Sequence, residues 1–589
     1  MGRACHAFEV NFSRLWPVAA FAVVGLGCLL LGCWLRAVYT PEWMSPDTMQ
    51  KPPAMHPWAV EADCYSQLAR VQRILHGQRL IQNHFTVENW PEGLAPSTTA
   101  PFDYAILLLY APLSLFTQYP LDWAGALVSP ALWVALVFFW MLFRSREFSL
   151  AGRAWLLIGS TALPAFIWAT ACGRPRHQSL ILALMAMGFT AEYERWQIEL
   201  TPKRAWNIFA GVVWGLACWT SLFEPSVVVV SLVLFNLIVR RRENTAFLAS
   251  FGIVILAMVL LEGRHIFDNI FNIYSLTPEN RQYALNWLGT IAEVRPIDFA
   301  EINRRLDAGD ISQWLEVFMA FMLPFVAWRL LARNGIHGTD LFLVLITTLL
   351  WVLASFQRRW SYYASLGELF LVVRYCQGAL DRGMSFVSML MLGLQTSRWP
   401  QFGSIVRLTA SCFAQIIILV LFLLGMFYAD YEQLKEHTNA PVNQPSLELA
   451  QISRAIDGPG AIMAPWWLSP GLLYFSGQPI VSGSSHCGIS GIVASAKFFS
   501  STSWADAEHI LRERQVRWVV VWDDPIYEYP LLNSSRGILG LPYASDDAKG
   551  DAESTIAQVL IADRYLPRML RLRGVTPQIK LYEYVPEGR

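Results

Sequence analysis

The sequence predicts an α-helical multi-pass membrane domain of about eleven transmembrane helices, followed by a small extracytoplasmic α/β domain. Of its 589 residues, 54% are hydrophobic and only 15% are charged, whereas charged residues make up about a quarter of a soluble protein. Apolar runs of about twenty residues, long enough to cross a hydrocarbon core of ~30 Å, recur over the first 430 positions. The mean hydropathy of +0.36 agrees with a membrane protein.

Charge, aromatic content and cysteine content narrow the function classes. The net charge is zero, so no nucleic-acid partner is expected. The 25 tryptophans and 20 tyrosines suit a protein that lines two membrane interfaces. Of the nine cysteines, Cys487 alone falls in the soluble tail, so no disulfide framework is expected there.

The first apolar run, at 16–35, is predicted to be an uncleaved transmembrane helix. Arg3 and Arg14 precede it, as they would in a cleavable signal, and the segment from Leu30 to Cys33 faintly resembles a lipoprotein cleavage box. The run is long for a signal, lacks a clear small-residue cleavage site and is followed by many further spans. These features favour the uncleaved helix.

Basic connections between the apolar runs set the orientation of the membrane domain, predicted at 1–430. Arginine and lysine collect at 144–147, 202–204, 240–242, 328–333 and 374–407. Positive residues favour the cytoplasmic side, and placing these connections there lets the spans alternate without conflict. The candidate spans are 16–36, 122–143, 154–171, 178–194, 206–222, 225–240, 246–262, 314–333, 339–356, 361–378 and 405–428. The N-terminus then lies inside and the C-terminus outside the cytoplasmic (inner) membrane.

Two long loops and one short turn are then external. The loops lie at about 37–121 and 263–312, and the turn is Gly173-Arg-Pro-Arg-His177. The apolar stretch 104–119 cannot be a span, because counting it would reverse every later loop. It is predicted to be an interfacial or re-entrant helix that ends the first external loop.

The chain changes character after the last span. Residues 431–445 are predicted to form a linker, and 446–589 an extracytoplasmic α/β domain. Within this domain the segments 447–456 and 505–515 have helical periodicity, while 517–522 and 579–584 read as strands.

The second long loop carries the most conspicuous candidate for chemistry. Glu293 lies in Leu288-Gly-Thr-Ile-Ala-Glu-Val-Arg-Pro-Ile-Asp298, within a polar segment between two apolar runs. Long loops on a compact scaffold are usually functional or disordered, and the recurring aromatic residues favour function. Asp63, in the first external loop, is a second external carboxylate. Such a pair could bind a hard divalent cation, or accept hydrogen bonds from a nucleophile and deprotonate it.

A pair of external arginines starts the span at 361–378. Arg358 and Arg359 depart from the charge bias of the other loops. A planar guanidinium is well suited to phosphate oxygens. The alternative is that these side chains reach lipid headgroups at the interface.

Five stretches, in order along the chain, together resemble the catalytic subunit of bacterial and archaeal single-subunit oligosaccharyltransferases. These proteins are multi-pass GT-C glycosyltransferases that move a glycan from a polyprenyl-diphosphate carrier to asparagine. The stretches are Asp63-Cys-Tyr65 with Arg70 and Trp90-Pro-Glu-Gly93, Gly173-Arg-Pro-Arg-His-Gln178, Thr290-Ile-Ala-Glu293, Arg359-Trp-Ser-Tyr-Tyr363, and Trp466-Trp-Leu-Ser-Pro470 with Gly483-Ser-Ser-His486. The third is similar to the family's Thr-Ile-x-Glu motif and the last to its Trp-Trp-Asp motif.

The resemblance implies a site between the membrane domain and the soluble domain. Asp63 and Glu293 would be catalytic, holding Mg²⁺ or Mn²⁺ and orienting the acceptor. Arg359, with Arg176, would bind the pyrophosphate of the donor, so that the leaving polyprenyl diphosphate is stabilised. The residues implied to grip a protein or peptide acceptor are Trp466, Trp467 and Thr290. The expected partners are therefore membrane lipid, a polyprenyl-diphosphate-linked glycan and a polypeptide.

Two motifs depart from the family pattern. Arg176 and Gln178 stand where the family has metal-side acidic residues, and arginine cannot ligate a metal. Leu468 stands where the family's aspartate is associated with reading serine or threonine of the acceptor sequon, and leucine cannot accept that hydrogen bond.

These departures leave more than one function open. The first hypothesis is an active transferase in which Arg176 partly replaces the charge of the metal and the acceptor is not a standard sequon. The second is a non-catalytic paralogue that only binds a lipid-linked glycan. A GT-C transferase using a polyprenyl-monophosphate sugar and a transporter are the remaining alternatives, although a transporter would more often carry ionisable residues inside its spans.

Overall fold

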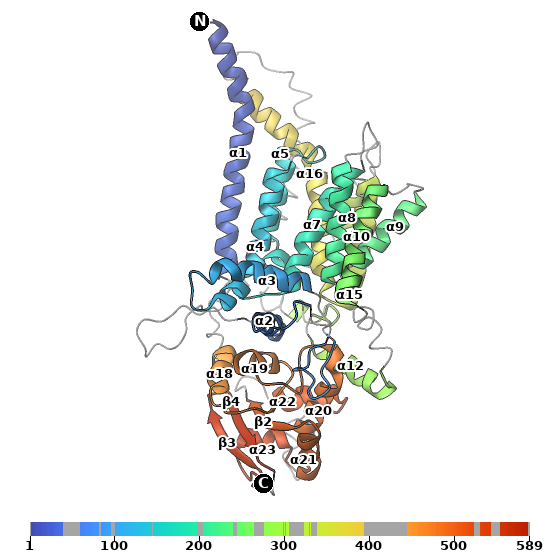
Figure 1. Cartoon of the computed structure of the whole chain (residues 1–589). Coiled ribbons are helices and arrows are strands. Elements are labelled where there is room, and N and C mark those ends of the chain that lie inside the picture. Colours follow the sequence, from blue (N-terminus) through green and yellow to red (C-terminus); the bar gives the residue numbers. More distant parts are fainter. Residues whose placement is uncertain are drawn as a thin grey trace.

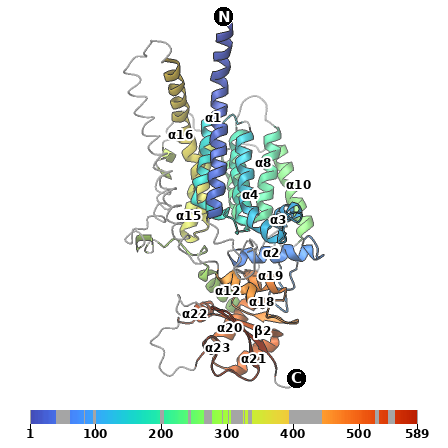
Figure 2. The same ribbon diagram turned by 90° about the vertical axis from the view of Figure 1, so that its left-hand side faces the viewer.

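The computed structural model comprises a bundle of long helices joined end-on to a smaller α/β domain (Figures 1 and 2). It describes residues 2–38, 59, 61–81, 84–95, 100–143, 145–196, 204–239, 244–263, 276–291, 293–298, 300, 302–304, 323, 324, 326–328, 330, 338–393, 444–523, 530–543 and 554–586. The N-terminus lies at the far end of the bundle and the C-terminus at the far end of the α/β domain.

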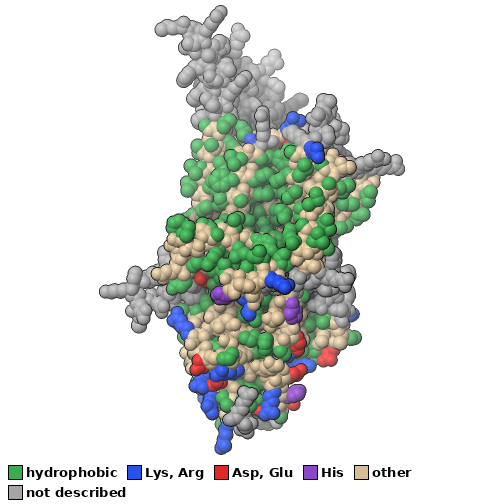
Figure 3. All heavy atoms as spheres, viewed as in Figure 1, with side chains coloured by type: hydrophobic (Ala, Val, Ile, Leu, Met, Phe, Trp, Pro, Cys, Tyr) green, Lys and Arg blue, Asp and Glu red, His purple; other side chains and the backbone are tan. Residues whose placement is uncertain are grey.

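The bundle contains the helices that the apolar runs predict. They are α1 (Gly2–Val38), α4 (Pro120–Leu142), α5 (Leu150–Ala162), α6 (Pro164–Ala169), α7 (His177–Arg195), α8 (Arg204–Thr220), α9 (Glu224–Ile238), α10 (Thr245–Glu262), α15 (Gly338–Phe356) and α16 (Trp360–Gly393). Within the described part of the chain, four helical segments are long and apolar enough to cross a membrane: Val18–Ala37, Pro120–Leu142, Thr245–Glu262 and Gly338–Phe356. Hydrophobic side chains cover the bundle, while charged side chains gather on the α/β domain (Figure 3). The chain is therefore a membrane protein.

The predicted number of about eleven spans stays a prediction. The span at 405–428 lies outside the described residues, and the span at 314–333 lies largely outside them. One predicted span, at 154–171, is divided in the structure at Leu163, where α5 ends and α6 begins. Pro164 explains this break, because proline has no backbone N–H with which to continue the preceding helix.

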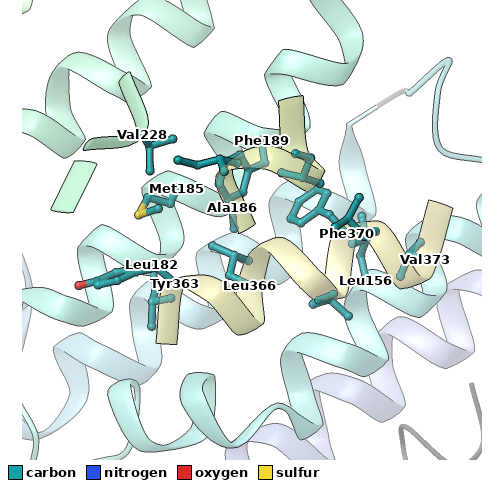
Figure 4. Packing of buried hydrophobic residues seen from close by; sticks show 14 of the residues in the cluster. Leu156, Leu182, Met185, Ala186, Phe189, Val228, Tyr363, Leu366, Phe370 and Val373 are labelled. Carbon is teal, nitrogen blue, oxygen red and sulfur yellow. The ribbon is translucent and has the colours of Figure 1, made fainter. Parts of the chain in front are cut away.

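The centre of the bundle is a close-packed apolar core. Side chains from α5, α7, α9 and α16 meet there, including Leu156, Phe189, Val228 and Phe370 (Figure 4). The ring of Phe370 lies 5.8 Å from the ring of Phe189 and edge-on to it. At Gly159 a Cβ atom would lie 2.2 Å from the end of the Leu369 side chain, so a larger residue on α5 would force that side chain of α16 to move.

Two helices of the first external loop cross the end of the bundle. Helix α2 (Ala62–Leu75) and helix α3 (Ala100–Leu113) lie between the bundle and the α/β domain. This placement agrees with the interfacial helix predicted at 104–119, although α3 begins and ends earlier. The two helices are joined by a buried ion pair between Arg70 Nε and Asp103 Oδ2, at 3.1 Å.

The C-terminal domain is built on a four-stranded sheet in the order β1-β2-β4-β3. The strands are β1 (Ala461–Met463), β2 (Val516–Trp522), β3 (Leu570–Val575) and β4 (Ile579–Tyr584). Strand β1 is parallel to β2, whereas β4 is antiparallel to both β2 and β3. Its helices are α18 (Gln444–Ser453), α19 (Ser469–Ser476), α20 (Ile489–Ser500), α21 (Trp504–Glu513), α22 (Pro530–Ile538), α23 (Ile556–Ala562) and the short η1 (His486–Gly488). The predicted α/β domain and its strands at 517–522 and 579–584 are confirmed.

The sheet buries a different set of side chains on each face. Val519, Val521 and Tyr582 pack with the helices of the outer side. Trp518 and Val520 instead belong to a core that continues through α18 and α19 into α2, α3 and α4. The α/β domain is thus attached to the membrane domain by a continuous hydrophobic core and not by its linker alone.

Helix α12 (Pro278–Thr290) carries the second external loop onto the α/β domain. Its N-cap Thr277 accepts a hydrogen bond from the Asn280 amide, and Pro278 occupies the first turn. Trp287 is buried against α20, and its ring lies 5.6 Å from that of Trp466. The α/β domain thereby fixes the segment that precedes Glu293.

Replacing Trp287 by alanine should release α12 from the α/β domain. Loss of a buried tryptophan costs roughly 3–5 kcal/mol, so trypsin should cleave after Arg281 faster than in the wild type. The matched control is Leu285→Ala, since Leu285 lies on the same helix and is 52% exposed. Equal cleavage rates for the two variants would contradict this role of Trp287.

Candidate active site

Four polar residues predicted from separate parts of the sequence meet at the junction of the two domains. Asp63 stands in the first turn of α2, and Arg176 directly precedes α7. Glu293 follows α12, and Arg359 directly precedes α16. The structure therefore places these residues between the end of the bundle and the α/β domain, as predicted.

The turn that carries Arg176 is held rigidly by its neighbours. Gly173 adopts φ +72° and donates its N–H to the Ala126 carbonyl at 3.1 Å; a left-handed φ of this kind favours glycine. Ser129 Oγ donates to the Arg174 carbonyl at 2.6 Å, and Ser179 Oγ donates to the Arg176 carbonyl at 2.7 Å. The backbone of the turn is thus fixed from both α4 and α7.

An aromatic side chain supports the two arginines of this turn. The ring of Trp168 in α6 lies 4.6 Å from the Arg174 guanidinium carbon and 5.0 Å from that of Arg176. Trp168 in turn stacks on Tyr362 of α16, with 5.2 Å between ring centroids. Cation–π contacts of this kind stabilise a guanidinium that has left bulk water.

The guanidinium of Arg176 lies among three carboxylates. Its Nη1 is 2.5 Å from Glu293 Oε1, and its Nη2 is hydrogen-bonded to Glu61 and lies 3.7 Å from Asp63 Oδ2. Arg174 Nη1 adds a second contact to Glu61, at 3.1 Å. The Arg176 side chain is 8% exposed, whereas that of Asp63 is 47% exposed. One buried cation therefore joins α2 to the loop of Glu293.

The charges of this cluster stabilise one another. Burial raises the pKa of the Glu61 carboxyl, but the Arg176 and Arg174 guanidinium groups outweigh it, and the net result is a lowered pKa. Burial also opposes the charge of Arg176, yet Glu61, Glu293 and Asp63 raise its pKa well above the ordinary value. Glu61 and Arg176 therefore each favour the charged form of the other.

Backbone hydrogen bonds hold Glu293 beside the start of α16. The Arg359 amide donates to the Glu293 carbonyl at 3.0 Å, and the Arg358 amide donates to the Arg295 carbonyl at 2.9 Å. Arg359 points its guanidinium toward Glu224, with 3.7 Å between Nε and Oε1, and its guanidinium carbon lies 5.0 Å from the Phe223 ring. These two backbone hydrogen bonds thus hold the residues predicted to act on acceptor and donor beside each other.

The predicted Mg²⁺ or Mn²⁺ site at Asp63 and Glu293 does not fit this geometry. The Arg176 guanidinium is ion-paired with both carboxylates, and a guanidinium cannot ligate a metal. In the described residues no group of three or more His, Cys, Asp or Glu side chains is arranged to hold a metal ion. The geometry favours the hypothesis that Arg176 supplies the positive charge at this position.

Glu61 was not among the residues predicted from the sequence. It directly precedes α2 and has the most contacts with the two arginines of the turn. The available signal was its spacing, since Glu61 and Asp63 stand two residues apart at the start of a predicted helix. Spacing alone could not have shown that both carboxylates face one arginine of another loop.

The three residues predicted to grip the acceptor line one cavity. Thr290, Trp466 and Trp467 line a space of about 450 Å³, together with Arg295, Pro530, Asn533, Ser534 and Tyr543. The rings of Trp466 and Trp467 lie edge to face at 5.7 Å. Leu468 is 3% exposed and packs in the core that the α/β domain shares with α2, α3 and α4. Its side chain therefore does not line this cavity.

Neither the protein-family models nor the curated proteins yield a match to this sequence. Several solved structures do resemble it. The oligosaccharyltransferase of Archaeoglobus fulgidus, tethered to an acceptor peptide containing the NVT sequon, superimposes with a TM-score of 0.62 at 14% identity, over 87% of this chain and 69% of that chain. The same protein in complex with zinc and sulfate superimposes with a TM-score of 0.57 at 13% identity, over 84% of this chain and 67% of that chain.

ArnT from Cupriavidus metallidurans, bound to undecaprenyl phosphate, gives a TM-score of 0.50 at 11% identity, over 97% of this chain and 98% of that chain. At such identities the likeness is one of fold. The chain thus has the GT-C fold of these membrane glycosyltransferases, as the motifs predicted.

Removing the guanidinium of Arg176 should create a metal site. In Arg176→Ala, the carboxylates of Glu61, Asp63 and Glu293 face one another with Arg174 paired to Glu61 alone, and oxygen ligands of this kind bind divalent ions. The expected result is about one tightly bound Mn²⁺ per chain, detected by electron paramagnetic resonance after dialysis.

The matched control is Arg174→Ala, which removes the neighbouring arginine and leaves Arg176 in place. This variant and the wild type should retain no Mn²⁺ after the same dialysis. Stoichiometric Mn²⁺ in the wild type would contradict the assignment of the positive charge to Arg176.

Proposed function

We propose that this protein transfers a glycan from a polyprenyl-diphosphate carrier to a protein acceptor, at asparagine or a non-standard residue, on the external face of the cytoplasmic membrane. The observation that carries the proposal is the cluster of Arg176 with Glu61, Asp63 and Glu293 beside Arg359. This cluster lies on a GT-C fold, at the end of the bundle where a lipid-borne donor would present its phosphates.

Arg359 is the residue best placed for the donor pyrophosphate. It begins α16, whose N-terminal amides add partial positive charge, and its side chain is 30% exposed. The Nε–H group is buried without a hydrogen-bond partner among the described residues. A guanidinium in this state would stabilise the negative charge that grows on the leaving diphosphate. Arg176 would add a second positive charge nearby.

Asp63 is the carboxylate best placed for the acceptor. Glu61 and Glu293 accept close hydrogen bonds from Arg176, whereas Asp63 lies 3.7 Å away and remains half-exposed. Its oxygens are free to orient the nucleophile. The cavity of Trp466, Trp467 and Thr290 would hold the flanking polypeptide, and apolar Leu468 offers no hydrogen bond to the hydroxyl of a standard sequon.

Support for a lipid-borne donor and a peptide acceptor comes from the structural neighbours. One solved complex of the Archaeoglobus fulgidus protein holds an inhibitory peptide and a dolichol-phosphate. The ArnT complex, which matches this chain over nearly its whole length, holds undecaprenyl phosphate. That match favours a second candidate function, in which the donor is a polyprenyl-monophosphate sugar. A binding protein without turnover is the third candidate.

The wild-type protein, purified with its native lipids, should retain a polyprenyl-diphosphate-linked glycan that mass spectrometry can identify. Arg359→Ala should retain at least ten-fold less of this donor than the wild type, since a hydrogen-bonded charged contact contributes roughly 1.5–3 kcal/mol. Asp63→Ala and Glu293→Gln should retain the donor and transfer it poorly. A monophosphate sugar in the wild type would select the second candidate, and normal glycosylation by both acidic variants would refute the site assignment.

Transfer should persist in the presence of a chelator, because Arg176 and not a divalent ion provides the charge at the carboxylate cluster. The measurement is the initial rate of glycan transfer with and without excess EDTA, using the same purified preparation. Abolition of transfer by EDTA, with recovery upon addition of Mg²⁺ or Mn²⁺, would contradict this expectation.

A further inference from the structure

A small, partly open pocket lies beside the carboxylate cluster. It has a volume of about 110 Å³ and lies between α2, the loop at 84–94 and the segment at 483–485 of the α/β domain. Its lining includes Asp63 of α2, His177 of α7, Glu88 of the loop and Ser484 of the α/β domain. Both domains therefore contribute walls to a space that adjoins the proposed site of transfer.

The loop that carries Glu88 is bound firmly to the α/β domain. The Ile480 amide donates to the Val87 carbonyl at 2.8 Å, and the Trp90 amide donates to the Ile480 carbonyl at 3.0 Å. Asn89 Oδ1 accepts hydrogen bonds from Ser490 Oγ and the Gly491 amide, both at 2.8 Å. Glu88 is thus held in place by its neighbours on both sides.

The side chain of Glu88 is pressed into the pocket wall. At Gly483 a Cβ atom would lie 1.7 Å from Glu88 Oε1, so the carboxyl occupies space that only glycine leaves open. The Ser484 backbone N–H donates a hydrogen bond to the carboxyl. Glu88 is 4% exposed, yet its Oε1 is buried without a hydrogen-bond partner in the described part of the chain.

Among the described residues, no cation forms an ion pair with this carboxyl. Arg70, on the same wall, is ion-paired with Asp103 and donates to Gln67. The pKa of Glu88 is raised to about 7, chiefly by burial; the charge of Arg70 opposes this rise, and the charge of Asp63 adds to it. A buried oxygen without a partner is uncommon and points to a ligand or a catalytic role, and a base poised near neutral pH is well suited to proton transfer.

We infer that the acceptor is a serine or threonine hydroxyl of a protein, which enters this pocket and donates its O–H to the carboxyl of Glu88. This inference rests on the proposed function and names its acceptor. A hydroxyl has one proton to donate, whereas the amide of asparagine has two, and one unengaged buried oxygen is present. The facing hydroxyls of Ser66 and Ser484, 3.1 Å apart, complete a lining suited to a small polar group.

The chemical step then balances without a further reagent. The acceptor oxygen forms a bond to C1 of the donor sugar while the bond from C1 to the diphosphate oxygen breaks. The diphosphate leaves with that electron pair, beside Arg359. The hydroxyl proton passes to Glu88, which becomes a neutral carboxylic acid and later returns the proton to water.

The test uses the full-length protein, its co-purified lipid-linked glycan and pairs of synthetic peptides that differ only in Ser, Thr or Asn at one position. Glycosylated peptide is measured by mass spectrometry. Serine and threonine peptides should be labelled and asparagine peptides should not. Glu88→Gln, which keeps the shape of the side chain, should lower kcat by at least 100-fold, as expected for loss of a general base, with little change in the KM for donor.

The matched control is Glu92→Gln, because Glu92 lies on the same loop, points outward and pairs with Arg514. It should transfer at the wild-type rate. Gel filtration and the Tm of each variant show whether the fold is intact, and Glu88→Asp, which retains a carboxyl, should recover part of the rate. Normal turnover by Glu88→Gln, or labelling of asparagine alone, would overturn the inference.

Failure of the proposed function would look different. In that case the wild type would carry no polyprenyl-linked glycan and would label none of the peptides. A wild type that holds the donor and labels asparagine peptides would refute the hydroxyl acceptor and leave the transferase assignment standing.

Discussion

The arrangement of the candidate site depends on the pairing of one buried guanidinium. Arg176 has left bulk water, and a buried charge is tolerated when opposite charges and hydrogen bonds surround it. Its partners Glu61, Asp63 and Glu293 come from two loops separated by some 230 positions. Removing one partner from such a buried pair typically costs about 3–5 kcal/mol, less where the partner is half-exposed. The ion pairs therefore hold α2 and the second external loop against the same turn.

The α/β domain is a structural part of this site. Its inner core continues into α2, α3 and α4, and Tyr474 of α19 donates a hydrogen bond to Asp122 of α4 at 2.8 Å. On the other side of the site a row of tryptophans, Trp287, Trp466, Trp467 and Trp522, joins α12 to strand β2. The loop of Glu293 is thus held by the α/β domain at one end and by α16 at the other.

Sequence reasoning succeeded where a pattern is local. The apolar runs predicted the helices of the bundle because burial in lipid requires long uninterrupted hydrophobic segments, and alternating residues predicted β2 and β4. The motifs predicted that Asp63, Arg176, Glu293 and Arg359 would meet. What they could not predict was the contact of Arg176 with Glu61, or the burial of Glu88 against Gly483, since each depends on how distant loops pack.

An arginine in place of a divalent ion changes what the rest of the site must do. A guanidinium carries one positive charge in fixed directions and accepts no further ligands, so it orders Glu61 and Glu293 but cannot bind the diphosphate and the acceptor at once as an open metal site can. In the proposed transfer, the charge that develops on the leaving diphosphate would then be met by Arg359 and the start of α16. The proton of the nucleophile likewise needs a base that Arg176 has not already engaged. Glu88, which is buried and lines the same pocket as Asp63, is the residue inferred to fill that role.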